Sequence, residues 1–367
     1  MSLDQDFVKQ RVSELKKVCI VGSTTWGTVI SKVIGTNIIK LDSFNDTVEL
    51  FVQEETIDDK GLIEVINETH ENPKYLPGCR LPDNVVAVSD VVEAAKEAHI
   101  IVFALQSEYI TSTCASLYGK IKPTAAGLCL TKGLELTEDG NIELFSQIIT
   151  RYLKIQTSVL MGANLCDEIA NELYCEATIG CKDKILAATL KELIETEYFR
   201  VSIIDDVDAV EVCGSLRNII ACGVGFLDGT DSGRSAKATV IRLGLIEMIK
   251  FIDLFYPASK VSTFFESCGI ADLATCYLAG QNRKYGEHFV KSKILSKSFD
   301  ESNEGSIEGL HTVRKLHTWL QEKDMTYKFP LFTAIYKVFA DELSPFCFLD
   351  NVHGNSEHNI RLYHLTW

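Results

Sequence analysis

The feature that most constrains the fold is a series of short, almost continuously apolar runs, each followed by a helical stretch. We expect strands at residues 17–21, 47–53, 100–105, 127–130 and 158–161. Strands that are apolar on both faces are typical of a parallel sheet covered by helices on both sides. The pattern therefore predicts a doubly wound, mostly parallel α/β domain.

The character of the chain changes near residue 205. Residues 207–223 and 236–255 are predicted as long helices that are apolar on almost every side, which is typical of the centre of a helical domain. We therefore expect an α/β domain over residues 1–205 and an all-α domain over residues 206–367, ending in a short polar tail. The active cleft is expected between them.

Charge and composition exclude several classes of partner. With 36 basic and 51 acidic side chains the net charge is −15, so nucleic acid and anionic membranes are poor partners. No apolar run reaches membrane-spanning length, and the first 17 residues are too charged for a secretory signal. These features predict a cytosolic protein.

Cysteine and histidine spacing predicts neither disulfides nor a metal site. The 12 cysteines are scattered without a C-x-x-C pair, and many lie in apolar runs, so we interpret them as reduced core residues. His353, His358 and His364 cluster near the C-terminus, and we interpret them as part of a mobile polar tail.

A glycine turn follows the first strand and leads into a helix, the context in which the dinucleotide fingerprint G-x-G-x-x-G is found. Its residues are Gly22, Ser23, Thr24, Thr25, Trp26 and Gly27. The middle glycine is replaced by Thr24, whose side chain is expected to crowd a pyrophosphate. Two interpretations stay open, a dinucleotide site and a generic strand-to-helix turn.

Acidic residues end the second strand, where a carboxylate accepts the ribose hydroxyls of NAD. Glu54 lies 27 residues after Gly27 (54 minus 27), more than the usual spacing of about 20. A longer loop over residues 35–46 would account for the difference. Alternatively, Glu54 and Glu55 form a solvated strand end.

Two cations draw attention for different reasons. Lys132 directly follows an apolar strand, at the edge where doubly wound sheets bind ligands, although a surface lysine is the simpler interpretation. Arg217 and its neighbour Asn218 lie in the apolar helix near residue 215. A buried cation must be paired or face a polar pocket, so we weigh a core ion pair against a pocket and favour the pocket.

Several longer stretches carry a resemblance to a known family. Residues 17–23 (KVCIVGS), 70–78 (HENPKYLPG), 159–164 (VLMGAN), 240–248 (VIRLGLIEM) and 266–273 (ESCGIADL) are similar to the eukaryotic cytosolic NAD-dependent glycerol-3-phosphate dehydrogenases. The likeness runs from about residue 16 to residue 351. It implies a Rossmann domain, a helical domain, NAD as cofactor and a homodimer. The implied reaction is reduction of dihydroxyacetone phosphate to sn-glycerol 3-phosphate.

The resemblance also assigns the substrate side of the cleft. It implies that Lys132 is the family's substrate lysine, and that four further positions line the cleft: Asn164, Asn218, Asp272 and Asn282. The family's catalytic lysine, in a motif reading G-A-L-K-N, falls on Arg217 within residues 214–218 (GSLRN). We assign catalytic roles to Lys132, Arg217 and Asp272. Because arginine stays protonated, it is a poor proton donor and we expect weakened turnover.

Other family positions are altered. The phosphate-binding arginine of a G-R-N-R-K motif falls on Gln281, which is also expected to contact the cofactor, and Arg283 could partly substitute for it. On the cofactor side the resemblance assigns Gln53 in place of a stacking phenylalanine, then Tyr109, Cys166, and Ser306 with Glu308 in place of a K-x-Q pair. Glu308 would bring a negative charge near the pyrophosphate.

Two functions follow as alternatives. The first is an NAD-dependent glycerol-3-phosphate dehydrogenase with weakened activity, which binds a small phosphorylated triose. The second is an inactive paralogue that kept the fold as a binding or dimerisation partner, for example in a heterodimer with an active subunit.

Overall fold

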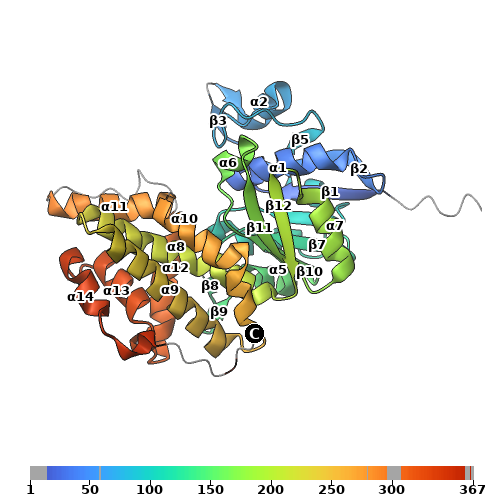
Figure 1. The fold of residues 1–367 in the computed structure, drawn as a ribbon. Helices are drawn as coiled ribbons and strands as arrows, with labels where there is room; N and C mark the ends of the chain where they lie inside the picture. The colour runs from blue at the N-terminus through green and yellow to red at the C-terminus, as the bar shows by residue number, and fades with distance from the viewer. Residues whose placement is uncertain (1–14, 58, 279, 296–306, 360–363, 365–367) are drawn as a thin grey trace, which may run out of the picture.

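The computed structural model describes residues 15–57, 59–278, 280–295, 307–359 and 364. Figure 1 shows two lobes, one built on a sheet with helices on both faces and one made of helices. The sheet has 8 strands in the order β12-β11-β10-β7-β6-β1-β2-β5. Every neighbouring pair is parallel except β10 and β11. The predicted doubly wound, mostly parallel α/β fold is confirmed.

The strands of the large sheet are β1 (Lys16–Val21), β2 (Phe44–Phe51), β5 (Val85–Val88), β6 (Ile100–Phe103), β7 (Ala126–Cys129), β10 (Gln156–Met161), β11 (Cys175–Gly180) and β12 (Phe199–Ile204). Two small hairpins join β3 (Thr56–Ile57) with β4 (Lys60–Gly61) and β8 (Glu135–Leu136) with β9 (Ile142–Glu143). All five predicted strands are present within a few residues of their expected bounds.

Helices cover both faces of the sheet. They are α1 (Thr25–Ile38), α2 (Leu62–Thr69), α3 (Val91–Ala95), α4 (Ile110–Leu117), α5 (Phe145–Leu153), α6 (Cys166–Ala170) and α7 (Lys184–Ile194). The apolar sides of α1 and α7 share one core with one face of the sheet, and those of α3, α4 and α5 share another with the opposite face. Burial on both faces explains why the strands are apolar throughout.

The helical lobe is arranged around α8 (Val207–Gly229), whose side chains are buried along almost its whole length. Around it lie α9 (Arg234–Phe255), α10 (Asp272–Leu278), α11 (Gln281–Ile294), α12 (Glu308–Glu322), α13 (Pro330–Phe339) and α14 (Phe348–Val352). Among the described residues α8 alone is long and apolar enough to span a membrane, and it is fully enclosed by the fold. Its composition is therefore that of a core helix.

One predicted loop needs correction. The expected loop over residues 35–46 is wrong, because α1 continues to Ile38 and β2 starts at Phe44. A Cβ at Gly35 would lie 2.8 Å from a side-chain carbon of Val85, so glycine lets α1 pack closely on the sheet edge.

The prediction of a mobile polar tail is wrong for His358. This side chain is buried, and its Nε2 lies 2.8 Å from Oε1 of Glu247 on α9. Glu247 is itself fully buried and accepts hydrogen bonds from the amides of Leu331 and Phe332 at the start of α13. A buried carboxylate needs such partners, so the part of the C-terminal segment around His358 belongs to the helical core. Among the described residues, no group of three or more His, Cys, Asp or Glu side chains is placed to hold a metal ion.

Candidate active site

The glycine turn joins β1 to α1 with no room for side chains at its first and last positions. Gly22 has φ +112°, and a Cβ there would lie 2.7 Å from the carbonyl oxygen of Ala104. A Cβ on Gly27 would lie 1.8 Å from the carbonyl oxygen of Gly22. Both glycines are therefore required for the turn and for close packing of helix on strand.

Thr24 caps α1. Its hydroxyl accepts a hydrogen bond from the amide of Gly27 at 3.3 Å and donates to the carbonyl of Ala104 at 2.8 Å. The side chain is thus bonded to the end of β6, and one of the amides that the fingerprint offers to a phosphate is already satisfied. The two preceding amides, those of Thr25 and Trp26, have no acceptor within the helix, and both residues line the cavity described below.

A buried asparagine from another segment, Asn72, holds the glycine turn in place by hydrogen bonds. Asn72 is fully buried, and its Nδ2 donates to the carbonyl of Ser23 at 3.1 Å and to Oγ1 of Thr28 at 2.9 Å. Sequence reasoning recorded the segment 70–78 only as part of the family resemblance. The signal was the polar residue itself, because a buried amide in a connecting segment needs partners to satisfy its donors.

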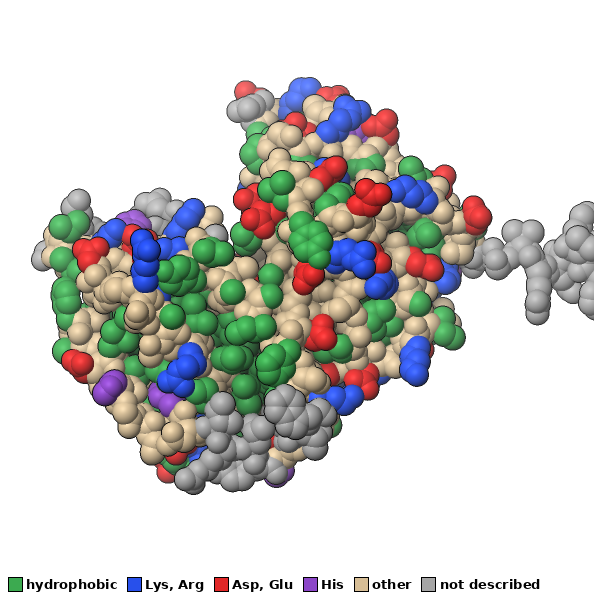
Figure 2. Space-filling view, in the orientation of Figure 1, with side chains coloured by type: hydrophobic (Ala, Val, Ile, Leu, Met, Phe, Trp, Pro, Cys, Tyr) green, Lys and Arg blue, Asp and Glu red, His purple; other side chains and the backbone are tan. Residues whose placement is uncertain are grey.

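A cavity of about 310 Å³ lies where the two lobes meet, and Figure 2 shows the surface indented between them. Eight residues predicted for the site line it: Thr24, Thr25, Trp26, Lys132, Asn218, Gln281, Asn282 and Glu308. They come from the glycine turn, the end of β7, the middle of α8 and the N-termini of α11 and α12. Chain segments more than 280 residues apart are thus brought together (308 minus 24).

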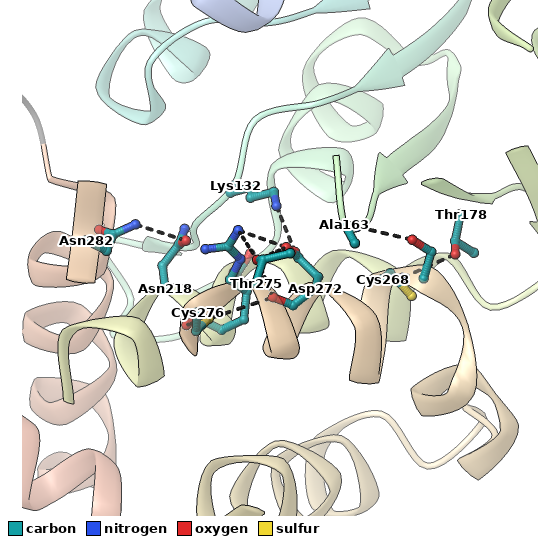
Figure 3. Close-up of polar contacts among 12 residues, drawn as sticks. Lys132, Ala163, Thr178, Asn218, Cys268, Asp272, Thr275, Cys276 and Asn282 are labelled. Atoms are coloured by element: carbon teal, nitrogen blue, oxygen red, sulfur yellow. Dashed lines mark hydrogen bonds and ion pairs between the residues drawn. The ribbon is translucent and has the colours of Figure 1, made fainter. Parts of the chain in front are cut away.

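Beside this cavity two cations bind one carboxylate. Nζ of Lys132 lies 2.9 Å from Oδ2 of Asp272, and the guanidinium of Arg217 lies 2.8 Å from Oδ1. Figure 3 shows Lys132 reaching from the α/β lobe toward Asp272 on the helical lobe. Arg217 also donates to Oγ1 of Thr275 at 3.4 Å, while its Nε has no partner among the described residues. The network joins the lobes at the predicted catalytic residues.

Burial and mutual attraction set the charges of this network. Burial raises the pKa of Asp272, but Arg217 and Lys132 outweigh that effect and hold it below its usual value. Burial lowers the pKa of Lys132, as does the charge of Arg217, and Asp272 only partly opposes them. The pKa of Arg217 is raised, because attraction to Asp272 outweighs its burial. Asp272 is therefore ionised, and Lys132 releases a proton more readily than an exposed lysine.

Both predicted interpretations of Arg217 and Asn218 hold in part. Arg217 is paired with a carboxylate, the alternative that we favoured less, and Asn218 lines the cavity. Oδ1 of Asn218 accepts a hydrogen bond from Nδ2 of Asn282 at 3.1 Å, and Asn282 in turn accepts one from the amide of Gly309 at 2.8 Å. These amides connect α8, α11 and α12 at the cavity wall.

Glu308 extends into the same region. Its Oε1 accepts a hydrogen bond from the amide of Ser107 at 3.5 Å, and its Oε2 would lie 3.2 Å from a Cβ on Gly133. Burial raises the pKa of the Glu308 carboxyl. The charge that the sequence predicted near the cofactor is therefore held inside the cleft.

The remaining predicted residues are placed outside the cavity lining. Arg217, Asp272 and Asn164 lie behind it and are buried, and Nδ2 of Asn164 has no partner among the described residues. The others follow the carboxyl ends of strands β1, β2, β6 and β10: Gly22, Ser23, Gly27, Gln53, Glu54, Tyr109 and Cys166. Ser306 lies outside the described residues.

Arg283 does not take the place of the missing phosphate arginine. Its Nε donates to Oδ2 of Asp228 at 2.6 Å, and its NH1 donates to the carbonyl of Leu278. The suggestion that it partly substitutes for the arginine lost at Gln281 is therefore wrong. Two lining residues that sequence reasoning missed are Tyr75, which lies within the family-like segment 70–78, and Gln106, which directly follows the predicted strand 100–105.

The residues present fit a dinucleotide at one end of the cleft. The strand end, the sterically required glycines and the helix N-terminus follow the fingerprint arrangement, and Glu54 comes shortly after the end of the neighbouring β2. The lining amides of Thr25 and Trp26 are donors suited to a phosphate. Glu308 opposes a second negative charge in the same cleft.

Comparison with known proteins agrees with this geometry. Family models described as the N-terminus and C-terminus of NAD-dependent glycerol-3-phosphate dehydrogenase match residues 17–187 and 206–350. The chain is 50% identical over 343 residues to the cytoplasmic glycerol-3-phosphate dehydrogenase [NAD(+)] of Drosophila melanogaster, covering 93% of this chain and 94% of that one. It is 47% identical over 327 residues to the Homo sapiens protein of the same name, covering 88% and 93%.

Among solved structures, the glycerol-3-phosphate dehydrogenase of Plasmodium falciparum superposes with a TM-score of 0.87 at 34% identity, covering 96% of this chain and 98% of that one. Sequence and structure thus agree over nearly the whole length of both lobes. The chain belongs to the NAD-dependent glycerol-3-phosphate dehydrogenase family.

Proposed function

We propose that this protein interconverts dihydroxyacetone phosphate with NADH and sn-glycerol 3-phosphate with NAD. The observation that carries the proposal is the Lys132–Asp272–Arg217 network beside the cavity at which the glycine turn ends. It supplies two positive groups and one ionised carboxylate where a ketone or alcohol oxygen can be polarised. The relatives named above support the same reaction.

The N-terminal side of the cleft would hold the cofactor. The amides at the start of α1 suit the pyrophosphate, and Glu54 suits a ribose hydroxyl, which favours NAD over its phosphorylated form. When bound, NADH supplies the hydride to the carbonyl carbon. We assign the edge positions Gln53, Tyr109 and Cys166 to the cofactor on the family resemblance alone.

The helical side of the cleft would hold the substrate. Asn218 and Asn282 present amide groups to the cavity, and Gln281 stands at the N-terminus of α11. A neutral amide at Gln281 gives a weaker phosphate contact than a guanidinium, so the substrate is bound less tightly than in relatives that carry arginine there. Arg217 stabilises negative charge that develops on the carbonyl oxygen.

The charge network favours an enzyme over an inactive paralogue. Two buried cations share the single carboxylate of Asp272, which leaves one net positive charge beside the cleft, and such an arrangement is costly to keep unless it binds or polarises a ligand. Lys132 also retains its position at the cavity.

NADH binding and turnover test the proposal. Isothermal titration of the purified protein with NADH is expected to give a saturable site, and addition of dihydroxyacetone phosphate is expected to consume NADH. The matched control is Asp272→Asn, which keeps the side-chain shape but leaves two buried cations without their counter-charge. Absence of NADH binding at millimolar cofactor would eliminate the dehydrogenase.

We also infer that the chain acts in the cytosol as a homodimer. The cytosol is supported by the relatives named cytoplasmic. Three large apolar side chains of one segment, Phe265, Ile270 and Leu278, are exposed, which supports a protein interface there. Light scattering is expected to give twice the chain mass, and Phe265→Asp is expected to favour the monomer.

A further inference from the structure

We propose that Lys132, and not Arg217, gives the proton to the substrate carbonyl oxygen and takes it back in the reverse reaction. The inference rests on the proposed function and concerns which residue of this site does the proton transfer. A guanidinium keeps its proton in a folded protein, so Arg217 can polarise an oxygen but is a poor acid or base. Arg217, which stands where the family motif has a lysine, therefore cannot transfer the proton in this protein.

Lys132 stands at the right place to do so. Its Nζ and the Arg217 guanidinium bind the two oxygens of the same carboxylate, at 2.9 Å and 2.8 Å. A substrate oxygen that reaches one cation is therefore close to the other. Lys132 lines the cavity, whereas Arg217 and Asp272 are not among its lining residues. Of the two cations, Lys132 is the one that faces the substrate space.

The surroundings of Lys132 favour release of a proton. Burial lowers its pKa, the fixed charge of Arg217 lowers it further, and Asp272 opposes both. A general acid works best when its pKa lies near the working pH. The permanent charge of Arg217 thus makes its neighbour a better proton donor.

The two thiols near Lys132 do not compete for this role. The thiols of Cys276 on α10 and Cys166 on α6 have their pKa raised by burial to about 11 and about 12, so both are neutral at physiological pH. Glu308 on α12 lies beside Gly133, and burial raises its pKa as well.

Ser215 fixes the backbone next to Lys132. Its hydroxyl accepts a hydrogen bond from the amide of Gly133 at 2.9 Å. The same hydroxyl can donate its one proton to the carbonyl of Gly133 at 2.8 Å or to that of Glu211 at 2.9 Å. Ser215 is fully buried. The family motif has alanine at this position, which has no group to make these bonds. Ser215 is therefore a positioning residue that holds the Lys132 turn against α8.

The step balances as follows for reduction. The carbonyl carbon gains the hydride and the C=O π bond breaks. The oxygen forms an O–H bond with a proton of the Lys132 ammonium, and the electron pair of the broken N–H bond stays on nitrogen. The neutral amine of Lys132 then regains a proton from water. Arg217 keeps its protons throughout and stabilises the negative charge on the oxygen.

The test is Lys132→Arg made in two backgrounds, the unmodified protein and the Arg217→Lys variant. Arginine at residue 132 keeps a charge for Asp272 but cannot transfer a proton. In the unmodified background kcat is expected to fall by about 10² to 10⁴, the range for loss of a general acid, with a smaller change in KM. In the Arg217→Lys background, the lysine at residue 217 can transfer the proton instead. There the loss in kcat caused by Lys132→Arg is expected to stay below about tenfold.

A second pair of variants tests Ser215. Ser215→Ala is expected to lower kcat by about tenfold and to move the kinetic pKa of kcat, and Ser215→Thr, which keeps the hydroxyl, is expected to retain both. Thermal melting of every variant identifies any that fail to fold.

The outcomes separate the two proposals. If the unmodified protein turns over and Lys132→Arg retains kcat, or loses it equally in both backgrounds, Lys132 only binds substrate and the inference is overturned. If the unmodified protein binds NADH but never reduces dihydroxyacetone phosphate, the proposed function fails as well.

Discussion

The carboxylate of Glu308 accepts a hydrogen bond from the Ser107 amide at 3.5 Å, so a half-buried acid links α12 to the edge of the cofactor side of the cleft. Burial raises the pKa of this carboxyl, which means that its neutral form becomes populated as the pH falls. Glu308→Gln removes the charge that opposes the pyrophosphate. We expect NADH to bind about tenfold more tightly, a gain of ~1.4 kcal/mol.

Titration of NADH at several pH values checks this expectation. The affinity of the unmodified protein should rise as the pH falls and Glu308 is protonated, and that of Glu308→Gln should not follow this trend. Glu322→Gln, an exposed acid at the other end of α12, changes the net charge equally and is the control. Equal effects from both variants would mean that the overall charge, and not this carboxylate, limits binding.

Gln281→Arg restores a guanidinium at the N-terminus of α11, where the side chain lines the cavity. A charged hydrogen bond to phosphate contributes about 1.5–3 kcal/mol, so KM for dihydroxyacetone phosphate should fall by about 10- to 100-fold. Steady-state kinetics measure the change. Gln321→Arg makes the same substitution on an exposed part of α12 and should leave KM unaltered. An unchanged KM in Gln281→Arg would place the phosphate elsewhere.

His358→Ala removes the ring that lies 2.8 Å from the buried Glu247. Because breaking a buried pair leaves a charge without its partner, the free energy of unfolding should fall by about 3 kcal/mol. Chemical denaturation measures the loss. The control is His353→Ala, since this histidine of the same segment is exposed and its removal should change stability by less than about 0.5 kcal/mol. Equal stability of the two variants would show that the segment contributes nothing to the core.

Glu211 makes stability depend on pH. It is fully buried on α8, and burial raises its pKa to about 7, although its oxygens accept hydrogen bonds from the amide and hydroxyl of Ser146. A raised carboxyl pKa means that the neutral form is favoured in the folded state. Protonated Glu211 therefore stabilises the fold. This contribution is complete below the ordinary carboxyl pKa of 4.5 and is lost as the pH rises to the raised pKa of about 7.

Glu211→Gln stays neutral, so its stability should not fall over that range. We expect it to exceed the unmodified protein by about 3 kcal/mol near about pH 8 and by much less near about pH 5. Thermal melting at both pH values measures the difference, with the exposed Glu192→Gln on α7 as control. A constant difference across pH would contradict a titrating Glu211.

The parts of the fold that the sequence predicted are those that burial dictates locally. β1, β6 and β7 are apolar because both faces of each strand are covered, and α8 is apolar because helices surround it. β11 and β12 were not predicted. β12, at the sheet edge, adds exposed and half-exposed residues, and the antiparallel pairing of β11 with β10 leaves no local pattern in the sequence.

The site was predictable in residue type but not in geometry. A lysine after a strand and an arginine in an apolar helix signal a function, yet nothing local shows that both bind Asp272, 140 residues beyond Lys132. The same holds for His358, whose partner Glu247 lies 111 residues away and turns an apparently polar tail into core. Such pairs form only when tertiary packing brings the charges together.

Turnover coupled to product identity tests the central claim most directly. Purified protein is mixed with NADH and dihydroxyacetone phosphate, and the loss of NADH absorbance is compared with the sn-glycerol 3-phosphate formed. We predict equal amounts of NADH consumed and product formed, and a rate that collapses in Lys132→Arg. NADH that binds without being consumed, at any pH at which the protein is folded, would contradict the account.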